Sequence, residues 1–175
     1  MPNKVTVTMN PALRTRALEE MAQLDTADMA RLRDRMDSRF KLHERSLFAT
    51  EGAAGGSRWP ELSSGYAKSK ARKFPGRKIL QRTGRLRRSL TEDGAEHVAT
   101  YALRPWASVT LGTKDTIAAY HTGRLRNPRT PERDPLQHTP TQMQVYLDVA
   151  AEYFTKIKLP RALRVLRAWS RSMGR

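Results

Sequence analysis

Apolar residues recur at steps of three and four positions between residues 29 and 47, which is the clearest pattern in the chain. Arginine and aspartate occupy many of the other positions, so the pattern predicts an amphipathic helix of about 22 residues. Asp25 or Thr26 is expected to cap its start, and Gly52 to cap its end. The apolar stripe consists of Met29, Leu32, Met36, Phe40 and Leu47, with His43 at its edge as a partly buried structural residue.

Three other stretches have the features of β-strands. Residues 4–9 alternate between apolar and polar side chains, which predicts a short half-buried strand. Residues 95–103 and 106–112 are two further strand candidates. Asn10-Pro11 is typical of a helix start, so a first helix is expected after the first strand, running to about Leu24.

The rest of the chain is expected to form short helices and loops. The order of strand, helices, strands and helices predicts an α+β fold, with a small antiparallel β-sheet packed against the long N-terminal amphipathic helix and with extra C-terminal helices. We expect an α+β domain over residues 1–140 and a C-terminal helical extension over residues 141–175. The remaining predicted helices are 63–73 (or 64–73), 84–90, one or two turns within 114–123, 141–158 and 160–172, and the predicted loops are 52–57 and 124–140.

The chain is strongly basic, with 33 lysine and arginine residues against 17 aspartate and glutamate residues. Residues 61–130 alone carry a net charge of +10, and no acidic residue occurs between Glu61 and Glu92. Such a segment can neutralise nucleic-acid phosphates, dock on an acidic protein surface or remain a solvated basic face. Between Glu61 and Glu92 only Tyr66 and Phe74 lie among the cations, which argues against a platform for stacked bases.

The sequence contains no recognised catalytic or metal-binding motif. Its four histidines, at positions 43, 97, 121 and 138, are too dispersed for a metal signature, and it has no cysteine. The glycine-rich stretch at 52–56 lacks the lysine and the preceding strand of a phosphate-binding loop. We therefore expect a protein that is not an enzyme and that uses neither a cofactor nor a metal ion.

The last predicted helix separates an apolar face, which includes Trp169, from a basic face, which includes Arg164 and Arg167. Docking on the domain or on a neighbouring subunit would use this arrangement, and so would binding to an anionic membrane surface. No apolar run approaches the roughly 18 residues of a membrane span, and no signal sequence is visible. We expect a soluble protein without a membrane partner.

Several short motifs follow one another in the middle of the chain. "WPELS" begins at Trp59, a lysine-rich stretch follows, and "KILQRTGRLRRSL" runs from Lys78 to Leu90. A tyrosine-histidine-glycine segment and "TPERDPL" at 130–136 come next. In this order, over roughly residues 59–136, the motifs resemble the virion morphogenesis family of tailed bacteriophages, whereas residues 141–175 have no counterpart in the pattern. The central residues of the resemblance are Ile79, Leu80, Thr83, Gly84, Leu86, Ser89, Tyr120, His121 and Gly123.

The resemblance implies a structural protein of the phage head–tail junction, either a neck or a tail-completion protein, made in the host cytoplasm and located in the virion. It implies a homo-oligomeric ring, with a hexamer as one candidate, that bridges the head connector or stopper to the tail tube or tail terminator. Four apolar residues would anchor the central motif in the core: Ile79, Leu80, Leu86 and Leu90. Thr83 would cap the following helix, and Gly84 would permit close backbone approach.

Charged and aromatic side chains in and around these motifs are expected to face partners. The alternative is a basic nucleic-acid-binding protein that acts through nonspecific phosphate contacts. In the phage assignment, contact with DNA is nonspecific. The predicted interface comprises Trp59, Lys78, Arg82, Arg85, Arg87, Arg88, Arg164, Arg167 and Trp169.

Overall fold

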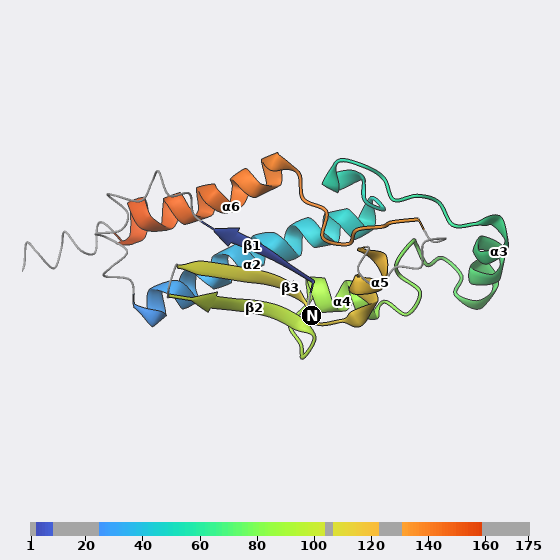
Figure 1. Ribbon diagram of the computed structural model, residues 1–175, viewed down its shortest axis with the longest axis horizontal. Coiled ribbons are helices and arrows are strands. Elements are labelled where there is room, and N and C mark those ends of the chain that lie inside the picture. Colours follow the sequence, from blue (N-terminus) through green and yellow to red (C-terminus); the bar gives the residue numbers. More distant parts are fainter. Residues whose placement is uncertain (1–2, 9–24, 104–106, 123–130, 159–175) are drawn as a thin grey trace, which may run out of the picture.

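A three-stranded antiparallel sheet and a long helix, α2, form the centre of the computed structural model (Figure 1), which describes residues 3–8, 25–103, 107–122 and 131–158. The central strand β3 (Ser108–Thr113) pairs with β1 (Asn3–Thr8) on one side and with β2 (His97–Ala102) on the other. In this register Leu111 lies opposite both Val5 and Ala99. The three predicted strands are confirmed, with ends shifted by one or two residues.

Helix α2 (Thr26–Ala49) follows the predicted apolar stripe. Asp25 caps its start as expected, because its side chain accepts a hydrogen bond from the backbone N–H of Asp28 at 2.7 Å. The predicted C-cap at Gly52 is wrong by two residues, since Thr50 is the C-cap. The chain leaves the helix at Thr50 because Glu51 (φ 52°) and Gly52 (φ 97°) both adopt left-handed backbone angles.

The glycine-rich stretch after α2 is not the flexible loop that the sequence predicted. Ala53–Gly55 forms a turn of 3-10 helix (η2), and Gly55 is buried. A Cβ atom on Gly55 would lie 2.8 Å from the carbonyl oxygen of Gln137 and 2.8 Å from the Leu47 side chain. The glycine is therefore required because two segments pack closely against the backbone at this point.

The remaining helices are short. The predicted helices at 63–73, 84–90 and 114–123 correspond to α3 (Ser64–Lys73), α4 (Arg85–Thr91) and α5 (Thr116–His121). The predicted helix 141–158 is α6 (Pro140–Glu152) followed by a π-helical turn, η3 (Tyr153–Lys158). The first helix predicted before Leu24, the helix at 160–172 and part of the predicted loop 124–140 lie outside the described residues.

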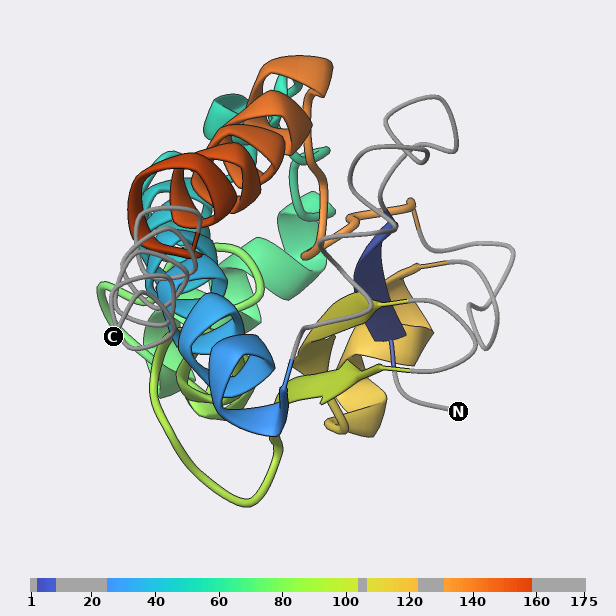
Figure 2. The same ribbon diagram turned by 90° about the vertical axis from the view of Figure 1, so that its left-hand side faces the viewer.

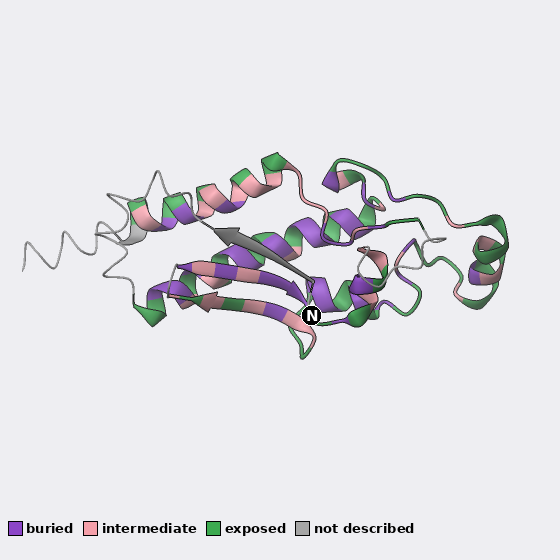
Figure 3. Ribbon diagram, in the orientation of Figure 1, coloured by how far each residue is buried: buried purple, intermediate pink, exposed green. Residues whose placement is uncertain are grey.

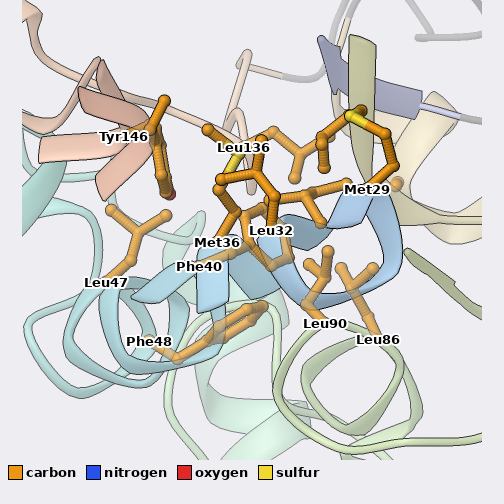
Figure 4. Packing of buried hydrophobic residues seen from close by; sticks show 14 of the residues in the cluster. Met29, Leu32, Met36, Phe40, Leu47, Phe48, Leu86, Leu90, Leu136 and Tyr146 are labelled. Atoms are coloured by element: carbon orange, nitrogen blue, oxygen red, sulfur yellow. The ribbon is translucent and has the colours of Figure 1, made fainter. Parts of the chain in front are cut away.

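The hydrophobic core forms where α2 meets the sheet, α4 and α6, and Figure 2 shows α6 and the sheet on different sides of α2. Tyr146 and Ala150 of α6 are buried in this same core. The predicted division at residue 140 stays a prediction, since residues 159–175 lie outside the described part. Figure 4 shows core side chains from α2 (Met29, Leu32, Met36, Phe40, Leu47 and Phe48), α4 (Leu86 and Leu90), Leu136 and Tyr146.

Two groups of polar side chains are buried along α2. The Asp37 cluster (Asp37, Lys41 and His97) is fully hydrogen-bonded: Asp37 contacts His97 Nε2 at 2.8 Å and Lys41 Nζ at 2.6 Å. Burial alone would raise the pKa of Asp37, but the hydrogen bonds from His97 and Lys41 outweigh it and hold that pKa below its ordinary value. Burial would lower the pKa of His97, but the hydrogen bond and charge of Asp37 raise it.

The Glu44 cluster (His43, Glu44, His138 and Tyr146) lies two helical turns further along α2. The Glu44 carboxyl is completely buried, and neither of its oxygens has a hydrogen-bond partner among the described residues. Burial, and to a lesser extent the charge of Asp134, raises the pKa of Glu44 well above its usual range. Burial also lowers the pKa of His138 to about 4.

Candidate partner-binding surface

Cations without acidic partners are exposed along α3, along the segment after it and on α4. Figure 3 shows most of α3 and the following segment as exposed. None of these cations forms an ion pair with a described acidic side chain, although other lysine and arginine residues make eight such contacts within the described residues. We call this set the basic surface: Lys68, Arg72, Lys73, Arg77, Lys78, Arg82, Arg87 and Arg88.

The segment 78–81 attaches the basic surface to the end of α2. Lys78 Nζ donates to the carbonyl oxygen of Ala49 at 2.6 Å, and Gln81 Nε2 donates to that of Phe48 at 2.9 Å. The last carbonyl groups of a helix have no partner within the helix and attract positive charge. Lys78 therefore has a structural role in addition to its predicted place at the interface.

Helix α4 separates a buried face from a charged one. The predicted anchoring of Ile79 and Leu86 is confirmed, since both are buried. Ser89 is also buried; its hydroxyl donates to the carbonyl oxygen of Leu86 and accepts from Thr113 Oγ1, both at 2.8 Å. This contact joins α4 to β3, and Arg87 and Arg88 remain on the exposed side.

The start of α4 differs from the prediction. Gly84, not Thr83, is the N-cap residue, and no side chain caps the helix there. Thr83 Oγ1 only reaches the N–H of Arg85, at a long 3.4 Å. Gly84 has φ 74°, and a Cβ atom on it would meet the side chain of Arg88 at 3.2 Å. The glycine is therefore needed for its left-handed backbone angle, and the predicted close backbone approach is wrong.

Trp59 is a core residue, which corrects its predicted place at an interface. It is 3% exposed, and its ring packs edge-on against Phe48 at 5.4 Å between ring centroids. Its indole N–H donates to the carbonyl oxygen of Asp134 at 2.9 Å. A buried tryptophan needs such an acceptor, and here a segment far away in sequence supplies it.

Arg133 completes this connection, and the sequence analysis missed it. The arginine is buried, and its guanidinium donates to the carbonyl oxygens of Pro60 and Glu61, both at 2.7 Å. The two sequence motifs, at Trp59 and at Arg133, therefore hold each other in place. The only signal in the sequence was an arginine between prolines in a segment that resembled the family pattern.

Arg85 also has an internal role, in contrast to its predicted interface role. Its Nε atom lies 3.1 Å from Asp115 Oδ2, and a second nitrogen lies 3.6 Å from Glu96 Oε1. The Asp115 side chain is completely buried and caps α5 through the N–H of Ile117. Arg85 compensates a buried charge, so we exclude it from the basic surface.

A groove of about 730 Å³ opens beside the basic surface, between α3, residues 79–86 and α5. Tyr66 and Tyr120 lie on its walls and are 46% and 54% exposed. Leu80, also on the wall, has a left-handed backbone angle (φ 60°), a strained state for leucine that is typical of functional segments. The cations that line the groove are Lys70, Arg82 and Arg133.

His121 lies in the groove but is held in the structure by its backbone. Its carbonyl oxygen accepts the N–H of Arg133 at 3.2 Å. Burial, followed by the charge of Arg133, lowers the pKa of His121, so the ring is neutral at pH 7. The other predicted residues Gly123, Arg164, Arg167 and Trp169 lie outside the described residues.

The fold brings together histidines that are dispersed in the sequence. The rings of His43 and His138 are 4.5 Å apart, with Glu44 beside them. The four histidines showed no metal signature in the sequence, but sequence spacing does not restrict contacts between α2 and the segment before α6. In the described parts of the chain, no helix is long and apolar enough to cross a lipid bilayer.

Comparison with protein families identifies the class of protein. The model of the phage virion morphogenesis family matches residues 12–155, and the chain therefore belongs to this family. The match confirms the resemblance seen in the central motifs and extends it in both directions, from before α2 into η3. The segment from 141 to 155, for which the motifs offered no counterpart, is thus part of the family pattern. A role in virion structure or assembly follows. No curated protein and no solved structure gave a significant match.

Proposed function

We propose that this protein is a structural subunit of the phage head–tail junction, where it forms a ring of identical subunits and joins the head connector to the tail. Its action is binding alone. The observation that carries the proposal is the basic surface beside an open groove, on a member of the phage virion morphogenesis family.

The chemistry of this region suits an acidic protein partner. Exposed cations that form no internal ion pair steer and orient an oppositely charged surface, and the groove walls offer apolar contact. Tyr66 and Tyr120 are large, rigid and exposed beside Arg82, which is the combination enriched at the centre of protein interfaces. An acidic surface with a projecting apolar side chain, on a head connector or a tail terminator, is the partner that we propose.

Charge reversal on α4 tests the proposal. The variant Arg87→Glu/Arg88→Glu changes two exposed residues and leaves the pair between Arg85 and Asp115 intact. The matched control, Arg35→Glu/Arg39→Glu, makes the same change of charge on exposed positions of α2. We expect the α4 variant to retain its fold and to reduce the yield of tailed particles, counted by electron microscopy after complementation, at least tenfold relative to the control. Equal yields from the two variants would refute an interface on α4.

Ring formation has its own test. Native mass spectrometry of the purified protein, alone and with head-connector protein, should detect one closed oligomer larger than a dimer. A protein that remains monomeric in both samples would contradict the ring.

The second candidate function is nonspecific nucleic-acid binding, which the exposed cations also favour. Against it, the ring of Phe74 lies 5.9 Å from the guanidinium of Arg82, so it contacts a cation of its own chain. Fluorescence anisotropy with duplex DNA separates the two functions. A dissociation constant of about 10⁻⁴ M or weaker at physiological salt supports the protein partner, whereas nanomolar binding with a steep salt dependence would favour nucleic acid.

A further inference from the structure

The Glu44 carboxyl is a buried polar group that lacks a hydrogen-bond partner within the described residues, and this calls for an explanation. It is 0% exposed, and both of its oxygens lack a hydrogen bond within the described residues. Native proteins rarely leave such a group unpaired, because the loss of hydration is costly, and a bound ion is one of the common explanations.

Two histidines surround this carboxyl. One nitrogen of His43, one of His138 and one oxygen of Glu44 all lie within 4.8 Å of one another. His138 Nε2 is 3.8 Å from Glu44 Oε1, and the side chains of these two residues are 4% and 0% exposed. The three residues come from α2 and from the segment before α6, so the fold alone creates the cluster.

One ring nitrogen of each histidine already has a backbone partner. His138 Nδ1 donates to the carbonyl oxygen of Leu136 at 2.7 Å, and His43 Nε2 donates to that of Gln137 at 3.1 Å. A carbonyl oxygen can only accept, so these contacts place the protons on His138 Nδ1 and His43 Nε2. His138 Nε2 is then an acceptor, which takes the hydrogen bond of the Tyr146 hydroxyl at 3.0 Å, and His43 Nδ1 keeps its lone pair. Backbone carbonyls orient metal-binding histidines in this way in known metal sites.

We propose that His43, Glu44 and His138 bind a divalent transition-metal ion, with Zn²⁺ as the best fit. Two imidazoles and one carboxylate are an established ligand set for Zn²⁺. The ion would displace the hydrogen bond that the Tyr146 hydroxyl donates to His138 Nε2 at 3.0 Å, and would leave that hydroxyl close enough to hold a water molecule as the fourth ligand. Tetrahedral zinc keeps its donor atoms about 3.3 Å apart, so Glu44 and His138 must approach by about half an ångström.

The Asp37 cluster is a useful contrast, because Asp37, Asp93 and His97 also bring three candidate ligands together. There, Lys41 already supplies the cation: its Nζ atom lies 2.6 Å from Asp37 Oδ2 and 2.6 Å from Asp93 Oδ1. The Glu44 cluster has no such ammonium group among the described residues. The metal is therefore assigned to Glu44 and not to Asp37. It would tie α2 to the segment that leads into α6.

Zinc binding by the full-length protein without an affinity tag tests the proposal. Protein treated with EDTA should take up one Zn²⁺ per chain, measured by mass spectrometry of the metal. Its melting temperature should rise by about 5 °C or more at a zinc concentration 100-fold above Kd. Co²⁺ in place of zinc should give the visible absorption of a four-coordinate site.

Two variants locate the ion. Glu44→Gln keeps the size of the side chain and should weaken zinc binding by about 100-fold, whereas His97→Gln, in the Asp37 cluster, should leave it unchanged. Loss of binding in His97→Gln, or full binding in Glu44→Gln, would overturn the proposal. So would wild-type protein that binds no zinc, in which case Glu44 is buried as a neutral acid. If Glu44→Gln fails to fold, the Co²⁺ spectrum of the wild type decides, and absence of a four-coordinate spectrum refutes the site.

Discussion

The Asp37 and Glu44 clusters lie seven residues apart on the same face of α2 and treat a buried carboxyl in different ways. Asp37 is surrounded by donors from Lys41 and His97, and these contacts lower its pKa. Glu44 has no donor within the described residues, and burial raises its pKa. Burial alone therefore does not decide whether a carboxyl is ionised. The hydrogen-bond donors around it determine whether its negative charge stabilises or destabilises the fold.

The largest effect is expected from Asp37→Ala, which removes the acceptor shared by two cations. Breaking a buried pair leaves an uncompensated charge, so we expect the free energy of unfolding to fall by about 3 kcal/mol in urea denaturation at pH 7. The control is Asp34→Ala, one turn earlier on α2, where the side chain is 64% exposed. The control should change stability by less than about 0.5 kcal/mol. Equal losses in the two variants would show that the Asp37 cluster contributes nothing specific.

Glu44→Met should act in the opposite direction in protein kept free of metal by EDTA. The substitution replaces an unpaired buried carboxyl by an apolar side chain of similar volume, and we expect a gain of about 1–2 kcal/mol in the same denaturation experiment. With added zinc the wild type should be more stable than Glu44→Met, since only the wild type would be stabilised by binding the ion. A loss of stability in EDTA would mean that Glu44 has a favourable partner after all.

The charge of His97 gives a smaller effect that depends on pH. Its folded pKa is raised above the unfolded value of 6.5, so its contribution is fully present below pH 6.5 and is lost as the pH rises through the folded pKa. The stability difference between wild type and His97→Gln should therefore be about 1 kcal/mol at pH 6 and should shrink by pH 9. Repeating the measurement in an Asp37→Asn background should abolish this dependence. If the stability difference depends on pH in the same way in the Asp37→Asn background, the dependence belongs to another group.

The smallest effect is expected for Asp93→Asn, at the outer end of the Asp37 cluster. The Asp93 side chain is 89% exposed, and Lys41 keeps its contact with Asp37 when Asp93 is neutralised. Exposed ion pairs contribute little, so thermal unfolding should report a change below about 0.5 kcal/mol. A loss close to that of Asp37→Ala would show that the exposed carboxylate, not the buried one, holds Lys41.

Local patterns predicted most of the secondary structure. The stripe from Met29 to Leu47, the Asp25 cap and the leucines of α4 were all visible, because helix periodicity and capping depend on neighbours within a few residues. The strands were also visible as alternating or β-branched segments. The end of α2 was missed because it depends on the left-handed angles at Glu51 and Gly52 and on the packing of the following turn.

Roles that depend on distant partners were not predictable. Trp59 was predicted to lie at an interface. In the structure it belongs to the core, because it contacts the carbonyl oxygen of Asp134 and the ring of Phe48. Arg85 was predicted to lie at the interface, but in the structure it pairs with the buried Asp115. The exposure of the remaining basic surface was predicted correctly, because no acidic residue interrupts the chain between Glu61 and Glu92 and none of these cations forms an ion pair within the described residues.

The sequence by itself determined the α+β class, the long amphipathic helix and membership of a phage assembly family, since each follows from local periodicity or from an ordered set of motifs. Only the tertiary structure decided which cations are free, which aromatic is core and which histidines meet. His43 and His138 come together because α2 and the segment before α6 pack side by side, and that packing depends on the summed burial of the whole core.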